Sequence, residues 1–506
     1  MLEAKGFFFD FIRLAGPYWH SEQKQRVRTE TLLLIVLTFA QMVLAVTMTE
    51  WSAALFNALE QHSMAGVLRQ IGLLVLIFAA SMTVTVLHLK VKRSLQVGWR
   101  QWLTEQVTQR WMNNAQHYLV THIQPVTHDN PDGRIAEDIR IATEEAISLC
   151  HSLLYSFLVL ISFTSILWSL SGEIDINLGF VEFSLRGHLV GIALIYAATA
   201  SFLGWRIGKP LIFATDNRQT AEANFRFGLV TAREHSLAIA LIHGEQDERQ
   251  RLNGSFNEII AAFNRQTKAM AEIMMFTSGY SILSTAFPIL VSAPRYVLGA
   301  ISLGSLMQSV QAFQQTTSAL SWPVDNMSMV AQWRASVERV LGLMKALDAL
   351  AEDLNNKSDI NRITLEKGDE SVLKFEDLCV ARLDKMICVG QLNADIHAGE
   401  RVLMAGDAFA GSKLFKAITG LWPWGTGRIQ LPDDEPIFFM PPRPYLPTGK
   451  LKAAICYPLS EAEFSDEQIY AAIRLAGVEE LMPELDTVDC WDKSLEREQQ
   501  QRFRRG

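Results

Sequence analysis

The sequence has little charge for its length and contains no block of basic residues. Only 20% of its 506 residues are Asp, Glu, Lys or Arg, whereas soluble globular proteins carry about 25%. The 46 Lys and Arg against 54 Asp and Glu leave a formal net charge of −8, and 49% of the residues are apolar. Because disorder needs low hydrophobicity and high charge, the composition excludes a disordered chain. It also argues against nucleic acid as a partner and favours a membrane protein.

Cysteine is scarce and no metal-binding spacing is present. The five cysteines are scattered and form no C-x-x-C pair, so the sequence predicts free thiols, with neither a disulfide framework nor a zinc site. His117, His122 and His128 are spaced by five and six residues. They therefore do not share a helical face, and we expect no metal site.

Long apolar runs are the dominant feature. Six of them come near the ~20 residues that cross a bilayer, and the last has the weakest apolar character. They cover residues 32–49, 71–89, 149–170, 189–205, 269–291 and 296–323. The first twenty residues have no small-residue cleavage pattern, so we interpret 1–28 as an interfacial amphipathic helix and not as a signal peptide.

The basic residues that flank these runs predict their orientation. Lys24, Arg26 and Arg28 precede the first run, and basic residues also follow the second and fourth runs. The connections after the first, third and fifth runs carry few basic residues. The excess of Lys and Arg in cytoplasmic loops therefore predicts a multi-pass protein of a bacterial-type inner (plasma) membrane, with both termini in the cytoplasm.

Two polar connections, 91–148 and 206–268, have helical periodicity. The simplest structure extends the membrane helices into the cytoplasm as long hairpins, and separate soluble helices docked on the membrane are the alternative. Within the sixth run, Gln308, Gln311, Gln315 and Ser318 share one helical face. Such a polar stripe at membrane depth lines a transport pathway, or it makes hydrogen bonds between packed helices.

Beyond the sixth run the pattern changes. A helix-like stretch, 335–350, closes a membrane domain that we place at 29–350, and a polar linker follows at 351–370. Strand-like runs at 372–378, 402–405 and 436–442 and an amphipathic helix at 413–421 then predict an α/β domain over 371–506.

One segment of this domain has the layout of a phosphate-binding loop, which is a strand, a glycine loop and a helix with the pattern G-x-x-x-x-G-K-[ST]. Gly406 and Gly411 have the required spacing, but Ser412 stands at the lysine position and Lys413 follows one residue later. One residue turns a helical side chain by ~100°, so we expect Lys413 to miss the phosphates. Phosphate binding and a vestigial, structural loop both stay open.

Residues 399–429, with the sequence GLWPWG inside them, resemble the phosphate-loop region of ABC transporter ATP-binding domains. The resemblance is to permease/ATPase fusions related to the SbmA/BacA peptide uptake proteins and to the peroxisomal fatty-acyl half-transporters. Residues 129–138 (DNPDGRIAED) resemble the N-P-D-x-R-I-x-x-D segment of this family, and 222–249 resemble its second cytoplasmic helix. The resemblance implies an α-helical membrane protein with a six-span, ABC exporter-like transmembrane domain, long cytoplasmic hairpins and a P-loop-type α/β domain.

Several positions depart from the family's pattern. Pro442 replaces the glutamine that senses the metal and the attacking water, and Glu496 and Glu498 replace the serine and glycine of the signature loop at 495–502. By resemblance, the acidic strand that holds Mg²⁺, the catalytic Glu and the switch His would follow Gly506. Phosphoryl transfer depends on Mg²⁺ and a positioned lysine. We therefore expect a degenerate, truncated ATP-binding domain that binds ATP and Mg²⁺ only by family analogy and does not hydrolyse ATP alone.

The resemblance further implies a homodimer that moves peptide-like or amphipathic solutes, since six spans make half a pathway in these folds. A heterodimer with an ATPase-competent subunit is an alternative. Another is proton-driven uptake, because glutamates of SbmA/BacA-like relatives are implicated in proton coupling, and Glu137 and Glu222 lie in the two resembling segments. Those glutamates could equally be solvated or paired, and the chain could be the inactive product of a disrupted gene.

Overall fold

The computed structural model describes residues 2–123, 130–177, 182–355, 362–368, 371–381, 387–432, 437–441 and 445–503. The chain divides into two compact units, Met1–Asp353 and Leu354–Gly506. The first is built from helices and the second contains a small sheet with short helices.

Long helices dominate the first unit. After α1 (Leu2–Ala15) and the 3₁₀ turn η1 (Gly16–His20), the main helices are α2 (Lys24–Glu60), α3 (Met64–Met112), α6 (Ile139–Ser171), α7 (His188–Glu234), α9 (Glu245–Val297), α10 (Leu303–Asp325) and α11 (Met327–Asn355). Short elements connect them: η2 (Asn113–Ala115), α4 (Gln116–Ile123), α5 (Pro131–Gly133), the π-helical turn η3 (Arg134–Asp138), α8 (Ser236–Leu241) and the antiparallel hairpin of β1 (Glu173–Asn177) and β2 (Glu182–Arg186). Helices suit this unit because they satisfy their own backbone hydrogen bonds without water.

Five of the six predicted spans coincide with helices that are long and apolar enough to cross a membrane. These are the helices that contain α2, α3, α6, α7 and α9. The sixth span was predicted to begin at Tyr296, but Tyr296 and Val297 end α9, and the run continues only as α10 from Leu303. The helix α10 does not qualify as a span on composition, because glutamine, serine and threonine interrupt its apolar residues.

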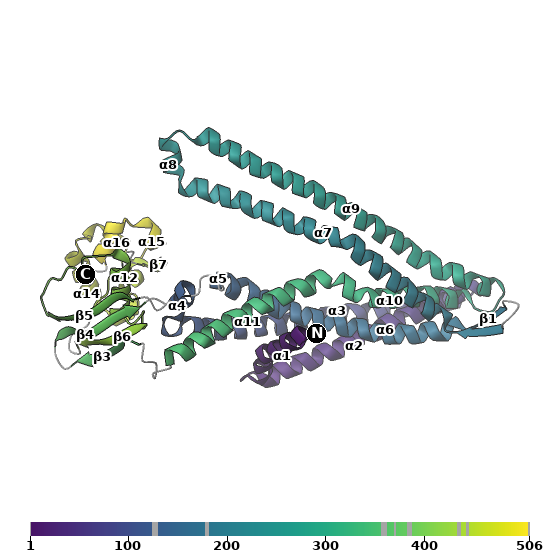
Figure 1. Cartoon of the computed structure of the whole chain (residues 1–506). Helices are drawn as coiled ribbons and strands as arrows, with labels where there is room; N and C mark the ends of the chain where they lie inside the picture. Colours follow the sequence, from purple (N-terminus) through teal and green to yellow (C-terminus); the bar gives the residue numbers. More distant parts are fainter. Residues whose placement is uncertain are drawn as a thin grey trace. The chain divides into compact units, whose positions relative to one another are not determined.

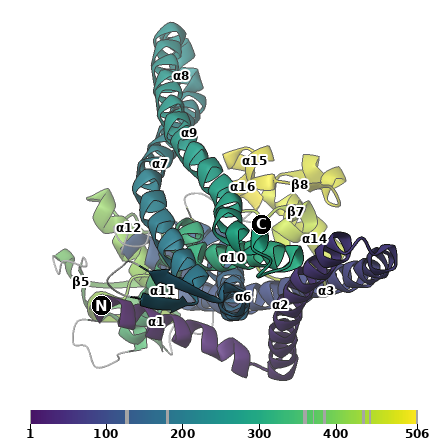
Figure 2. The same ribbon diagram turned by 90° about the vertical axis from the view of Figure 1, so that its right-hand side faces the viewer.

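The second predicted hairpin is present as long continuous helices, whereas the first is interrupted after Met112 by the short elements η2, α4, α5 and η3. The helix α3 continues 23 residues past the predicted span end at residue 89, to Met112. The helices α7 and α9 pack along each other, and α8 closes their far end, as Figures 1 and 2 show from two directions. The polar connection at 206–268 is therefore a helical hairpin and not a separate soluble domain.

Two apolar clusters hold the first unit together. One joins α1, η1, α3, α6 and α11 around Trp99, Val107 and Val337, each at most 2% exposed. The other joins α2, α6, α7 and α10 around Phe163 and Phe313, both fully buried. In α1, Phe7 and Phe11 pack against the first cluster, and an opposite row, Phe8, Phe9 and Ile12, is exposed, as expected of an interfacial helix.

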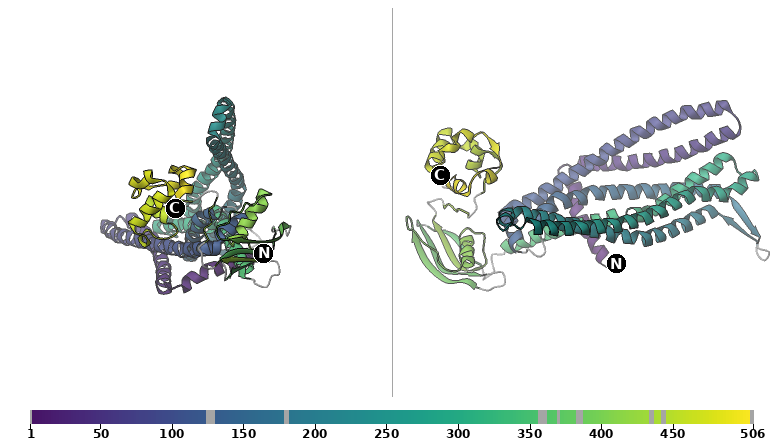
Figure 3. Two further views of the ribbon diagram at one scale, coloured as in Figure 1. Left: turned by 90° about the vertical axis from the view of Figure 1, so that its left-hand side faces the viewer. Right: turned by 90° about the horizontal axis from the view of Figure 1, so that it is seen from above.

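The second unit contains a four-stranded sheet in the order β3-β6-β4-β5. Its strands are β3 (Thr364–Gly368), β4 (Val372–Ala381), β5 (Ile387–His397) and β6 (Gly425–Pro432), and only the β3–β6 pair is parallel. The helix α12 (Ala408–Ile418) packs against β4 and β5, and Figure 3 shows the sheet from two further sides. A second cluster, around Leu451, Ile473 and Trp491, is formed by α13 (Leu451–Cys456), α14 (Asp466–Ala476), η5 (Glu479–Glu484), α15 (Trp491–Ser494) and the segments between them. The remaining short elements of this stretch are β7 (Gly449–Lys450), η4 (Glu461–Glu463), β8 (Val488–Asp489) and α16 (Arg497–Phe503).

Three sequence-based expectations differ from this unit. The strand expected at 402–405 is absent, and residues 437–441 of the run 436–442 are likewise outside any strand. The segment expected to be a linker contains β3, which pairs with β6. An apolar run becomes a strand only where a neighbouring strand offers hydrogen-bond partners, and the sheet of this unit pairs β3, β4, β5 and β6 with one another instead.

Candidate functional site

The glutamines predicted to line a pathway lie on α10 with different surroundings. Gln311 donates from Nε2 to the Ser52 hydroxyl of α2 at 2.9 Å. Gln308 is half-buried and Gln315 is exposed. Gln311 thus makes the interhelical bond that was the alternative reading of this stripe, and none of the three glutamines lines the cavity described next.

A cavity of about 520 Å³ is bounded by α7, α9, α10 and the first residues of α11. Besides Thr317, its polar lining from α10 consists of side chains that recur once per turn, at positions i, i+4, i+7 and i+11, which share one helical face. They are Gln314, Ser318, Ser321 and Asp325. The opposite wall from α9 adds the hydroxyls of Thr277, Tyr280, Ser281 and Ser284.

Ser318 is the one residue of the predicted stripe that lies in this wall. The predicted stripe began at Gln308 and ended at Ser318, whereas the cavity wall continues along α10 to Asp325. Extending the helical periodicity of the stripe past Pro323 would have identified Asp325 as part of the cavity wall. The prediction ended the stripe at Ser318, inside the apolar run that ends at Pro323.

Aromatic rings stiffen the α7–α9 contact beside the cavity. The rings of Tyr196 and Tyr280 stack with centroids 4.7 Å apart, and the Tyr196 hydroxyl donates to the Tyr280 carbonyl oxygen at 2.7 Å. Phe276 stacks on Tyr280 at 6.2 Å. On the other side of these rings lies a second cavity of about 560 Å³, which is largely apolar and includes Glu272.

The acids that were candidates for proton coupling lie in η3 and within α7. Glu137 is exposed in η3, and Glu222 accepts a hydrogen bond from Arg218 Nε at 3.1 Å within α7. Glu222 therefore has the helical ion pair that was the alternative to proton coupling.

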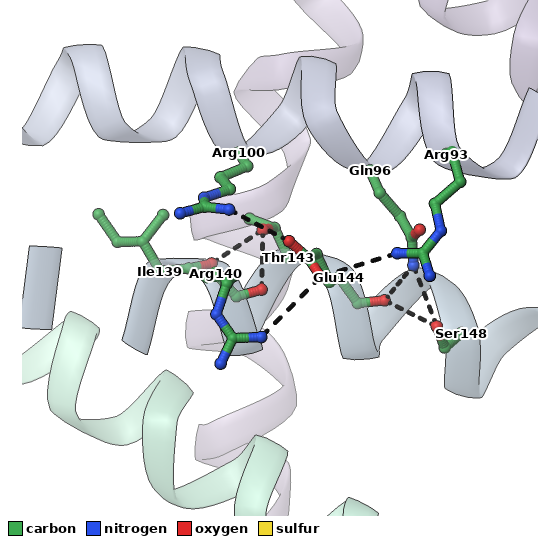
Figure 4. Close-up of polar contacts among 8 residues, drawn as sticks. All are labelled: Arg93, Gln96, Arg100, Ile139, Arg140, Thr143, Glu144 and Ser148. Atoms are coloured by element: carbon green, nitrogen blue, oxygen red, sulfur yellow. Dashed lines mark hydrogen bonds and ion pairs between the residues drawn. The ribbon is translucent and has the colours of Figure 1, made fainter. Parts of the chain in front are cut away.

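Glu144, another acid of this region, lies on α6 and contacts three arginines, of which Arg93 and Arg100 belong to α3 and Arg140 to α6 itself (Figure 4). Its carboxylate lies 3.4 Å from Arg100 Nη1 and 4.0 Å from both Arg93 Nη1 and Arg140 Nη1. Its backbone carbonyl accepts from Gln96 Nε2 at 2.7 Å. This set of contacts fixes the register of the two helices where they leave the predicted membrane region.

The N-P-D segment is tied to α11 by an ion pair between a buried carboxylate and a half-exposed guanidinium. Asp138, whose side chain is 9% exposed, accepts from Arg339 Nε at 2.7 Å and from Nη2 at 2.5 Å. The hydrogen bond with Asp138 raises the pKa of the Arg339 guanidinium. Asp129, at the other end of the resembling segment, lies outside the described residues, as does His128.

In the segment that resembles a phosphate loop, the two charged residues Asp407 and Lys413 both contact other parts of the protein. Asp407 is the N-cap of α12, and its carboxylate accepts from the Phe409 N–H at 3.3 Å. Lys413 places its amine 3.2 Å from the centroid of the buried Trp422 ring. Gly406 has φ +138°, a conformation that favours glycine, whereas Gly411 and Ser412 lie within the helix.

The residues that resemble a signature loop form the start of α16. Glu498 pairs with Arg502 at 2.6 Å one turn along the helix, and the Glu496 N–H donates to the Gln499 side chain at 3.1 Å. Both carboxyl-bearing residues thus have local structural contacts. Pro442, the other departure from the family's pattern, lies outside the described residues.

The helical unit defines the class of protein. Residues 17–297, from η1 to the end of α9, match the family model of ABC transporter transmembrane region 2. The chain belongs to this family. The match includes all five candidate spans and ends where α9 ends, before α10.

Relatives of the chain are ABC transporters in bacteria, plants and animals. The inner membrane ABC transporter ATP-binding protein YddA of Escherichia coli is 27% identical over 505 residues, which are 97% of this chain and 86% of the relative. The chloroplastic ABC transporter D family member 2 of Arabidopsis thaliana is 26% identical over 90% of this chain and 68% of its own. The human ATP-binding cassette sub-family D member 3 is 23% identical over 65% and 53%.

Proposed function

We propose that the chain is one half of a homodimeric ABC-type transporter of an inner (plasma) membrane, which moves peptide-like or amphipathic solutes. The observation that carries the proposal is the hydroxyl-lined cavity between α7, α9 and α10, because polar groups at membrane depth belong to pathways or packed interfaces. Counting α10 as the sixth span puts both termini in the cytoplasm, in agreement with the basic residues that flank the spans.

We further infer that the chain does not hydrolyse ATP alone. A helix N-terminus attracts phosphate through its unpaired N–H groups and its dipole, but at α12 the carboxylate of Asp407 already takes that place. A bound phosphate would therefore meet a negative charge. The amine that should neutralise it, on Lys413, is held over the ring of Trp422. These residues fit a nucleotide phosphate poorly, so we assign no catalytic step to them.

If ATP is not the energy source, three alternatives follow. The first is proton-driven uptake of the SbmA/BacA kind, in which Glu137 is a candidate for proton coupling. A heterodimer could instead obtain competent sites from another subunit. Finally, the chain could be the inactive product of a disrupted gene, which would neither hydrolyse ATP nor move solute.

Mg-ATP hydrolysis by the purified protein in lipid nanodiscs tests the inference, with Lys413→Ala as the matched control. We expect no activity above that of the variant, and proton-driven uptake into liposomes is then the next measurement. Turnover that depends on Lys413 would contradict the inference, since it would require the amine to leave Trp422 for a phosphate.

A further inference from the structure

We propose that the cavity between α7, α9 and α10 binds the cationic group of an amphipathic solute, and that the carboxylate of Asp325 selects it. This inference rests on the proposed transport function and names the chemistry of the solute. Three features carry it: the charge of the cavity, the rings and hydroxyls in its wall, and the apolar space beside it.

Asp325 is the one charged residue among the described side chains that line the cavity. It ends α10, where the helix dipole is negative and disfavours an acid. The Asp325 side chain is exposed, and within the part of the chain that the structure describes no ion pair to it is found. A carboxylate in such a position has no stabilising role in the helix, whereas low-dielectric walls focus its potential on an entering cation.

The wall supplies the groups that bind an ammonium ion. Trp205, Phe276 and Tyr280 line the cavity, and aromatic faces attract cations. The amine of Lys209 lies 5.9 Å from the centroid of the Trp205 ring, so this indole already accepts an ammonium group at its surface. Lys209 itself is not part of the lining. The serine and threonine hydroxyls can accept hydrogen bonds from the remaining N–H groups of the solute.

The neighbouring apolar cavity can accommodate the apolar part of the solute. The two cavities share Ala200, Phe276 and Tyr280 as lining residues. Leu203, Ile207 and Leu283 add apolar wall to the second one. A molecule with a cationic head and an apolar tail would place the head near Asp325 and the tail across Phe276. A neutral molecule of the same shape would bind more weakly, and the Asp325 carboxylate would repel an anionic one.

Equilibrium binding of a fluorescent amphipathic amine, dansylcadaverine, to the full-length protein in nanodiscs tests the assignment. The N-acetylated probe has the same ring system without the charge and serves as the matched ligand. We expect Asp325→Asn to weaken binding of the amine about tenfold and to leave the acetylated probe unchanged. Glu258→Gln removes an exposed acid of α9 outside both cavities and is expected to change neither.

Two further measurements protect the test against misfolding of the variant. In the wild type, amine binding should be lost when the pH is low enough to protonate Asp325, because the amine stays charged while the carboxylates of the two cavities, Asp325 and Glu272, are neutralised. Gly204→Leu should weaken both probes. A Cβ at Gly204 meets Phe276 and Val324 at 3.6 and 3.9 Å, which is ordinary contact, so the added side chain fills the cavity without backbone strain.

Equal affinity for both probes, or an amine affinity that Asp325→Asn leaves unchanged, would overturn the assignment of a cation site. Absence of binding by either probe would also overturn it. These outcomes are separable from failure of the transport function, because binding requires neither ATP nor solute movement. A protein that binds the amine through Asp325 and transports nothing would retain the site and lose the proposed function.

Discussion

The two units expose apolar side chains for different physical reasons. In the helical unit, Leu76 and Ile195 are 66% and 70% exposed on continuous helices, whose backbone groups are satisfied internally, so such surfaces suit a bilayer. In the C-terminal unit, Leu403 is 89% exposed on a segment without regular structure. A helix can present an apolar exterior by itself, whereas an apolar run in an α/β domain is buried only when other strands arrive to pair with it.

The comparison shows which contacts each unit depends on. The first unit relies on contacts between long helices, including polar ones such as Asp138 with Arg339. The second relies on a few large buried side chains near its sheet, of which Trp422 is 2% exposed. Variants in each unit therefore test the difference directly.

Trp422→Ala should produce the largest loss. The indole is buried, donates to the Ala381 carbonyl at 2.8 Å and holds the Lys413 amine, and truncating such a side chain costs about 4 kcal/mol. Hydrogen exchange of the full-length protein should then rise in β4, β6 and α12 with the helical unit unchanged. Tyr470→Ala, on an exposed ring of α14, is the control. Unchanged protection of β6 would contradict this account.

Arg339→Leu should cost about 3 kcal/mol, because it leaves the buried Asp138 carboxylate without its partner. The loss should appear in thermal unfolding of the helical unit in nanodiscs. Arg251→Leu removes an exposed pair with Asp247, at 2.9 Å, and should cost at most about 0.5 kcal/mol. Equal effects of the two variants would show that burial of Asp138 does not matter.

Asp407→Ala should destabilise α12 by about 1 kcal/mol, since it removes an N-cap. Faster hydrogen exchange at the first turn of α12 is the expected result. Ser465→Ala removes the N-cap of α14 and calibrates the size of the effect. If protection at α12 instead increased on adding inorganic phosphate to the Asp407 variant, the carboxylate would be shown to occupy an anion site.

Leu403→Gln should have the smallest effect, within about 0.5 kcal/mol, as for other exposed positions. Protection of the sheet in hydrogen exchange and the thermal midpoint are the measurements. A loss of several kcal/mol would mean that residues 402–404 are buried in solution, and the contrast drawn between the two units would fail.

Much of the helical unit could be predicted because its signals are local. Apolar length located five spans, and periodicity between them indicated that α7 and α9 continue beyond the membrane. The end of α9 at Val297 and the start of α10 at Leu303 were less accessible, because Tyr296 is compatible with either helix. The strand expected at 402–405 failed for a non-local reason, namely which strands pair in the sheet.

The membrane class, the family resemblance and the long helices follow from the sequence, because hydrophobic length and helical period act within one segment of chain. The face of α10 that meets a cavity does not, because it depends on how the helices pack. Gln311 is turned toward Ser52, and the next face along, with Ser318 and Asp325, meets α7 and α9. Helix rotation is set by the packing of neighbouring helices, and that information is spread over residues more than a hundred positions apart.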